Sequence, residues 1–171
     1  MLIRRLLSSD AHAFQTMRLA ALRDAPSAFS SSYEEECETA LETIENNLSV
    51  RNLFGAFDGA ALAGMVGVGR DKAPKLRHKG YIAAMYVAGE HRSKGAGRLL
   101  LEHALDFAAS LYGLRQLTLV VTAGNAPAIA LYESVGFSVY GTEPGALLAD
   151  GVFYDNVLMA RRFDDNYMPL A

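Results

Sequence analysis

The sequence predicts a single α/β domain of about seven strands and about four helices, spanning residues 1–171. The chain has 171 residues, of which 51% are hydrophobic and 20% are charged, which is typical of one folded domain and not of a disordered chain. Strand-like and helix-like segments alternate along it, and no linker, repeat or low-complexity segment separates them.

The chain is expected to begin with one strand and two helices. Residues 2–6 form an apolar and basic run that predicts the first strand. Asp10 is placed to cap a helix that runs to about residue 23, because a carboxylate there can accept the free amides of the first turn. Apolar residues at helical spacing predict a second helix over about residues 35–47.

Three strands follow. An Asp-Gly pair at positions 58 and 59 lies between two apolar runs, which predicts a hairpin of strands 53–57 and 61–68. A basic loop comes next. Residues 81–87 are then apolar on both faces, which is typical of a strand in the middle of a sheet.

The last part of the chain predicts a helix, a strand, a helix and two strands. Residues 98–112 are the clearest amphipathic helix, and Gly113 is suited to its C-terminal cap. Residues 117–121 are a buried strand, and Asn125 is expected to cap a short helix that ends at Gly136. The final strands are expected at residues 137–140 and 153–159.

Composition excludes several classes of protein. The net charge of −3 and pI of about 5.8 argue against a general nucleic-acid binder. Cys37 is the only cysteine, and the histidines lack metal-ligand spacing, so we expect neither a disulfide nor a metal site. No window approaches the ~18 apolar residues of a membrane span, and the first residues lack the apolar stretch of a signal peptide. We therefore expect a cytoplasmic protein without a membrane or nucleic-acid partner.

The most informative segment is the turn at residues 92–98, which follows the apolar strand and precedes the long helix. Gly95 and Gly97 allow backbone amides to approach a ligand closely. The helix start adds free N–H groups and the positive end of the helix dipole. Arg92, Lys94 and Arg98 add three positive charges. This combination favours a phosphate or pyrophosphate site over an ordinary strand-to-helix turn.

Two other phosphate-binding motifs do not match this turn. The dinucleotide motif G-x-G-x-x-G requires glycine at position 100, which is Leu100. The P-loop pattern G-x-x-x-x-G-K-[ST] is absent. A nucleotide-binding α/β protein of another class is therefore disfavoured.

The segment Arg92-x-x-Gly95-x-Gly97 resembles the acetyl-CoA pyrophosphate loop of the GCN5-related N-acetyltransferase (GNAT) family. Residues 125–137, Asn-Ala-Pro-Ala-Ile-Ala-Leu-Tyr-Glu-Ser-Val-Gly-Phe, resemble the second signature of that family at each position. Ser93 stands where the family frequently has glycine. The resemblance implies the family fold, with a mixed, mostly antiparallel sheet, and an acetyl-CoA-dependent N-acetyltransferase.

The resemblance also implies roles for particular residues. In the family an amine attacks the thioester directly in a ternary complex, and the strand at Met85, Tyr86 and Val87 splays from its neighbour to bind the pantetheine arm. Tyr132 corresponds to the residue that protonates the departing thiolate, although it is also a half-buried aromatic that packing alone would explain. The implied acetyl-CoA-binding residues are Met85, Tyr86, Val87, Arg92, Ser93, Lys94, Gly95, Ala96, Gly97, Arg98, Asn125 and Tyr132. For Asn125, a capping role is an equal alternative.

The general base and the acceptor are not apparent from the sequence. Residues 80–87 contain no carboxylate, which leaves the run Glu34-Glu35-Glu36, Glu90, His78 or a water chain as candidates. The basic loop at residues 70–79 is a solvated connection or a contact for the 3′-phosphate. Small-molecule amines and peptide amines both remain as acceptors.

Two further alternatives stay open. The same fold could hold an acyl-CoA as a regulatory module without turnover. A homodimer could form through the apolar residues near the end of the sequence, Tyr167, Met168 and Leu170.

Overall fold

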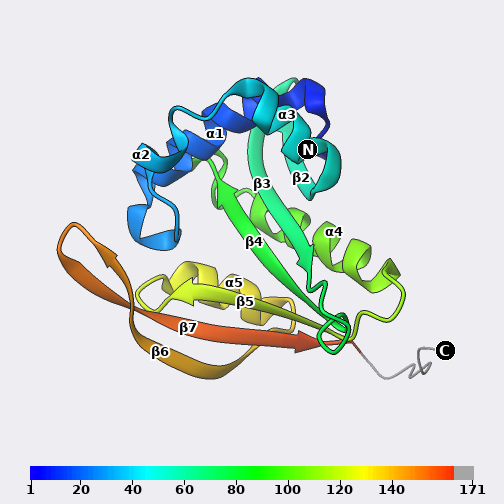
Figure 1. The fold of residues 1–171 in the computed structure, drawn as a ribbon, viewed down its shortest axis with the longest axis vertical. Helices are drawn as coiled ribbons and strands as arrows, with labels where there is room; N and C mark the ends of the chain where they lie inside the picture. Colours follow the sequence, from blue (N-terminus) through cyan, green and yellow to red (C-terminus); the bar gives the residue numbers. More distant parts are fainter. Residues whose placement is uncertain (164–171) are drawn as a thin grey trace.

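In the computed structural model, which describes residues 1–163, the chain forms a seven-stranded sheet in the order β1-β2-β3-β4-β5-β7-β6 (Figure 1). All neighbouring strands pair antiparallel except β4 and β5, which are parallel. The expected mixed, mostly antiparallel sheet is confirmed. The apolar residues considered for a dimer, Tyr167, Met168 and Leu170, lie outside the described residues.

The first half of the chain supplies one layer of helices and four strands. Strand β1 (Leu2–Arg5) leads into α1 (Ala11–Asp24), α2 (Tyr33–Glu36) and α3 (Leu41–Val50). Strands β2 (Asn52–Asp58), β3 (Ala61–Arg70) and β4 (Lys79–Val87) follow. Gly59 makes the β2–β3 turn at φ +59°, a left-handed conformation that favours glycine.

The second half adds a helix on the opposite face and extends the sheet. Helix α4 (Ala96–Ser110) precedes β5 (Gln116–Thr122), and α5 (Ala126–Ser134) precedes the hairpin of β6 (Ser138–Ala149) and β7 (Val152–Arg162). Strand β7 inserts between β5 and β6, so the hairpin closes the sheet on that side.

Two layers of apolar side chains bury the sheet. On one face, Leu100, Leu101 and Ala104 of α4 pack with Leu117 of β5 and Met159 of β7, all fully buried. On the other face, residues of α1 and α3 pack on β2 and β3 in two smaller clusters. The helices thus cover both faces of the N-terminal part of the sheet (Figure 1).

The expected bounds of one helix and of the last two strands were wrong in detail. The predicted helix at residues 35–47 is two helices, α2 and α3, and residues 1–163 contain five α-helices, close to the expected number. A capping box formed by Ser32 and Glu35 starts α2 earlier than expected, and α2 ends at Glu36. The last two strands are far longer than the predicted 137–140 and 153–159 because they form one extended hairpin.

Asp10 precedes α1 as expected, but its carboxylate does not cap the first turn of that helix. It accepts hydrogen bonds from the backbone N–H of Leu7, at 2.8 Å, and from the guanidinium of Arg4. Asp10 therefore ties β1 to the turn before α1. Among the described residues, no helix combines the length and the apolar character needed to cross a membrane.

Candidate active site

The site is built around an opening in the sheet. Parallel pairing between β4 and β5 is limited to three residue pairs, from Lys79 opposite Gln116 to Tyr81 opposite Thr118. Beyond Tyr81 the two strands diverge, as Figure 1 shows. The expected splay of β4 from its neighbour is confirmed by this short register.

A bulge in β4 accompanies the divergence. Met65 and Gly67 of β3 face Tyr86 and Ala83 of β4, so β4 contains one extra residue. Ala84 adopts φ +52°, which is unusual for a residue with a side chain. The extra residue reverses the alternation of side chains, so Met85 and Val87 join Ile82 in the core packed against α4 and α5.

The bulge leaves polar backbone groups of β4 at the open edge. The N–H of Ala88 donates to Ala63 on β3 at 3.0 Å. Since neighbouring residues of a strand direct their polar groups to opposite edges, those of Val87 and Met85 face the opening. The carbonyl of Val87 accepts a hydrogen bond from Nε of Arg92 at 2.9 Å.

The turn after β4 has the backbone that an anion site requires. Ser93 and Gly95 adopt φ +58° and +84°, and α4 begins at Ala96. The conformation at Ser93 is one that glycine adopts without steric cost, so glycine would be favoured at this position. The N–H of Leu99 makes the first intrahelical bond, to Gly95, so the N–H groups of residues 96–98 have no acceptor within the helix.

The charged side chains of this turn are arranged differently from the expectation of three cations around one anion. Arg92 forms an ion pair with Asp24 at the end of α1, and Tyr86 donates to the same carboxylate at 3.2 Å. The hydrogen bonds from Arg92 and Tyr86 hold the pKa of Asp24 below its ordinary value. Arg98 pairs with Glu102 one turn along α4. Lys94 is exposed on the turn.

Gly97 is close to two other elements, α5 and β4. A Cβ added there would lie 3.1 Å from Leu131 of α5 and 3.5 Å from Met85 of β4. The glycine thus allows the start of α4 to pack against both sides of the opening. It has this packing role whether or not an anion binds.

Tyr132 lies on α5 within the core beside this opening. The side chain is 7% exposed and packs edge-on against Phe137, with ring centroids 6.1 Å apart. Burial raises the pKa of its phenol to about 12. Among residues 1–163 its hydroxyl makes no hydrogen bond, so packing accounts for the ring but leaves the hydroxyl available to a ligand.

Asn125 caps α5 as predicted. Its side-chain oxygen accepts a hydrogen bond from the backbone N–H of Ala128 at 3.3 Å. This contact explains the asparagine without a ligand, so a contact with acetyl-CoA stays a prediction.

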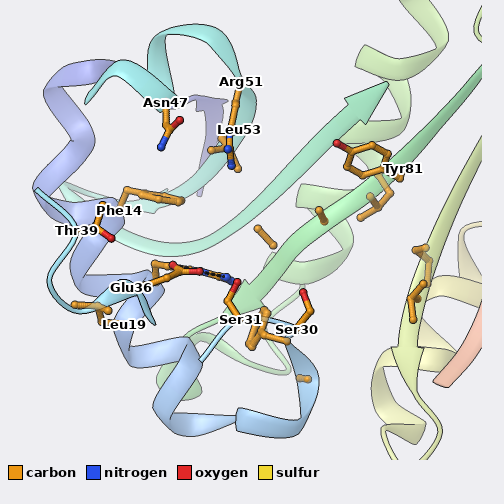
Figure 2. Close-up of a pocket in the computed structure, with 18 of the residues that line it drawn as sticks. Phe14, Leu19, Ser30, Ser31, Glu36, Thr39, Asn47, Arg51, Leu53 and Tyr81 are labelled. Atoms are coloured by element: carbon orange, nitrogen blue, oxygen red, sulfur yellow. Dashed lines mark hydrogen bonds and ion pairs between the residues drawn. The ribbon is translucent and has the colours of Figure 1, made fainter. Parts of the chain in front are cut away.

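A cavity of about 790 Å³ lies where β4 and β5 diverge, on the face covered by α1, α2 and α3. Figure 2 shows side chains of Phe14, Glu36 and Tyr81 around it, from α1, α2 and β4 respectively. A volume of this order is typical of small-molecule sites. The floor is formed by β4, β5 and β7, so the opening between the strands connects with the cavity.

One candidate base from the sequence lies in this cavity. Glu36 makes two hydrogen bonds, of 2.7 and 2.8 Å, with the guanidinium of Arg18. This pairing, opposed by burial, lowers the pKa of Glu36. Glu34 and Glu35 line a separate polar cavity between α2 and the tip of the β6–β7 hairpin. Glu90 and His78 line neither cavity.

Sequence reasoning missed two polar residues of the cavity floor, Thr122 and Asn156, which are 9% and 7% exposed. They face each other across the β5–β7 ladder. A buried asparagine within an apolar strand is a signal that could have directed attention to Asn156. Within the described part of the chain, no group of three or more metal-ligating side chains is present.

Comparisons with known proteins agree with this architecture. The model of the acetyltransferase (GNAT) family matches residues 18–137. An N-alpha-acetyltransferase of Saccharolobus solfataricus is 38% identical over 88 residues, which cover 52% of this chain and 51% of that protein. The chain spans about half the length of the curated relatives that it matches.

Solved structures resemble the whole described fold. The acetyltransferase of the GNAT family from Streptococcus pneumoniae has a TM-score of 0.87 and 26% identity, over 95% of this chain and 99% of that chain. The structure of yncA from Salmonella typhimurium, solved with its cofactor acetyl-CoA, has a TM-score of 0.82 and 22% identity, over 100% of this chain and 98% of that chain. The second likeness concerns the fold alone.

The raised pKa of Tyr132 predicts a loss of stability at alkaline pH. Between about pH 10 and pH 12 the phenol ionises in the unfolded chain but keeps its proton in the folded chain. The unfolded state then binds fewer protons, so the free energy of unfolding falls as pH rises, by up to about 1.4 kcal/mol per pH unit from this group. Urea unfolding at several alkaline pH values should show a shallower decline for Tyr132→Phe than for the wild type. Equal slopes would contradict the burial of the ionisable hydroxyl.

Proposed function

The chain belongs to the acetyltransferase (GNAT) family, and we propose that it transfers an acetyl group from acetyl-CoA to a primary amine in a ternary complex. The observation that carries the proposal is the opening between β4 and β5. It runs from the free amides at the start of α4 to the cavity under α1 and α2, with Tyr132 beside it.

In this proposal acetyl-CoA lies along the opening. Its pyrophosphate is held by the amides of residues 93–98 and by Lys94, because a helix start and a nearby cation both favour an anion. The pantetheine arm pairs with the free edge of β4 at Met85 and Val87, as a further strand would. The structure of yncA, a protein of similar fold, was solved with acetyl-CoA, which supports this cofactor as the donor.

The amine enters from the cavity and attacks the thioester carbonyl. The C–N bond forms as the C–S bond breaks, and the negative charge that develops on the carbonyl oxygen is stabilised by a backbone N–H of β4 at the open edge. Tyr132 gives its proton to the departing thiolate. The phenol, whose pKa burial raises from 10 to about 12, is protonated at neutral pH, which is the state that a general acid requires.

The attacking nitrogen must also lose a proton. Glu36 is the carboxylate of the cavity, but its lowered pKa and its ion pair with Arg18 make it a weak proton acceptor. We therefore assign this proton to water in the cavity, one of the routes that the sequence left open.

The first experiment combines calorimetry with CoA and thiol release from acetyl-CoA in the presence of a panel of amines. Binding in the roughly micromolar range and amine-dependent thiol release are expected. Lys94→Glu should weaken CoA binding at least tenfold, because it places a negative charge beside the pyrophosphate.

Lys75→Glu is the matched control, since it reverses the charge of another exposed lysine on the basic loop between β3 and β4. It should leave binding unchanged; an equal loss would place the 3′-phosphate on that loop. Tight binding of CoA without thiol release for any amine would favour the regulatory module instead.

Substitutions of Arg92 and Asp24 are expected to change CoA affinity in opposite directions. If Arg92 exchanges Asp24 for the pyrophosphate on binding, Arg92→Ala should raise the dissociation constant for CoA roughly tenfold. Asp24→Asn should lower it, because the competing carboxylate is gone. The effect of Arg92→Ala should be smaller with a pantetheine fragment that lacks phosphates. Weaker binding in both variants would mean that the ion pair only positions the turn.

Tyr132→Phe tests the general acid. The maximal rate of acetyl transfer should fall by a factor of about 10²–10⁴, with little change in CoA affinity, because only a hydroxyl is removed and the ring still packs against Phe137. Single-turnover measurements ensure that chemistry is observed. An unchanged rate would reduce Tyr132 to a packing residue.

A further inference from the structure

We propose that the acceptor is an α-amino carbonyl compound, in which the carbon next to the amine carries a carboxylate or a peptide carbonyl, and that Asn156 binds it through its side-chain amide. The proposal rests on the proposed acetyltransferase function, since it names the acceptor of the same site. It is carried by the polar groups on the cavity floor.

Asn156 is a polar side chain enclosed by strands. It lies on β7, opposite Thr122 of β5 and Glu143 of β6, and is 7% exposed. The part of its side chain that is not covered by protein lines the cavity. Asn156 therefore lies beside the end of β5 that has separated from β4. The acetyl group of the proposed cofactor would lie in this gap.

The amide of Asn156 makes no hydrogen bond among residues 1–163. Its neighbour Thr122, by contrast, is satisfied, because its hydroxyl donates to the carbonyl of Ser27 at 2.5 Å. Among the described residues, His91 Nδ1 is the one fully buried side-chain nitrogen or oxygen atom without a partner, so the amide atoms of Asn156 are accessible from the cavity. An amide that the protein leaves unbonded on a cavity floor is placed to hydrogen-bond a ligand. A ligand that hydrogen-bonds the amide gives a physical reason for the asparagine.

The backbone around Asn156 is held in place. The preceding residue, Asp155, accepts a hydrogen bond from Ala123 through its carbonyl and from Gly145 through its side chain, at 2.9 and 2.8 Å. The register of β6 against β7 also shifts at this point, between Glu143 and Leu147. These contacts fix the direction in which the amide is presented.

The chemistry of the amide selects the ligand. An asparagine offers one acceptor, Oδ1, beside one donor group, Nδ2. A simple alkylamine has donors only while its lone pair attacks the thioester, so it satisfies Oδ1 and leaves Nδ2 unpaired. An α-amino carbonyl compound presents an N–H donor and a carbonyl or carboxylate acceptor on adjacent carbons, and it pairs with both.

The charge of the cavity also favours an acceptor that carries a carboxylate. Its charged lining consists of Arg18, Arg51 and Glu36, which leaves a net positive charge. Arg18 is paired with Glu36. Within residues 1–163 Arg51 forms no ion pair, although its charge also contributes to the lowered pKa of Glu36. A carboxylate on the acceptor is favoured by this field, and a second ammonium group, as in a diamine, is disfavoured.

The test compares α-amino acids with amines that differ only in the carbonyl group. Thiol release from acetyl-CoA is measured with leucine, leucinamide, 3-methylbutylamine and 1,4-diaminobutane. Three further sets each contain an amino acid (one small, one aromatic, one acidic), its amide and the amine that lacks the carbonyl group. In at least one set, kcat/KM should be roughly 10²-fold or more higher for the carbonyl-bearing acceptor than for the amine that lacks it. A preference for the amino acid indicates a free carboxylate, and a preference for the amide indicates a peptide N-terminus.

Asn156→Leu separates recognition from structure. It should lower kcat/KM for the preferred acceptor at least tenfold. The kcat/KM for the matched amine should stay within a few-fold of the wild-type value, and the KM for acetyl-CoA should be unchanged. Its urea midpoint should equal or exceed that of the wild type, because the substitution removes no side-chain hydrogen bond within residues 1–163 and adds apolar surface to the cavity floor. Thr122→Val is the structural control, which should lower the midpoint because it breaks the bond to Ser27.

The outcomes distinguish the two proposals. No thiol release with any amine would overturn the proposed function, and this inference with it. Turnover in which alkylamines or the diamine are used as well as α-amino carbonyl compounds would overturn the inference alone. A reduced urea midpoint of Asn156→Leu, with equal losses for all acceptors, would make Asn156 a structural residue and would also overturn it.

Discussion

The interaction on which the site depends is the short parallel pairing of β4 with β5. Three residue pairs hold the two halves of the sheet together, and the strands then separate. A longer ladder would satisfy the edge groups of Met85 and Val87 within the protein and would leave no place for a ligand. The extra residue at Ala84 keeps the side chains of both residues in the core. On the open side their backbone has no neighbouring strand, and the carbonyl of Val87 accepts from Arg92 instead. The bulge thus allows a stable sheet and an open edge to coexist.

The separation of β4 from β5 also connects the two ends of the site, the turn before α4 and the cavity under α1 and α2. At one end, β4 leads directly into the turn and α4, so the amides for an anion are adjacent in sequence to the open edge. At the other end, α1 and α2 cover the gap and enclose the cavity. Strand β7 supports β5 along seven residue pairs, from Gln116 to Thr122. The half of the sheet that has lost β4 as a neighbour is therefore still ordered, and Asn156 and Tyr132 are held beside the gap from different elements.

The features that could be predicted from the sequence were those determined by residues close together in the chain. The turn at residues 92–98 and the segment 125–137 carry their signals in adjacent residues, so the start of α4, the cap at Asn125 and the place of Tyr132 were all expected. Contacts distant in sequence were not. Nothing near Arg92 indicates that Asp24, 68 residues away, is its partner. The positive φ of Ala84 could not be predicted from its residue type, since glycine or asparagine is the usual residue in that conformation. Asn156 lies among strand residues, and only the folded sheet shows that it lines a cavity.

The ion pair between Arg92 and Asp24 is compatible with an anion site at the same turn. Both side chains are about half exposed, at 50% and 47%, and an exposed pair contributes only about 0–1 kcal/mol. A charge-assisted hydrogen bond to a ligand anion contributes about 1.5–3 kcal/mol, so exchange of the carboxylate for a pyrophosphate would be favourable. The pair neutralises the charge of Arg92 and joins the turn to the end of α1. Since α1 also lines the cavity through Phe14 and Arg18, this contact links the turn proposed to bind the pyrophosphate to the wall of the cavity proposed for the acceptor. Release of Asp24 would change the contacts of α1 at the moment when the cofactor is bound, and this coupling follows from the position of one carboxylate.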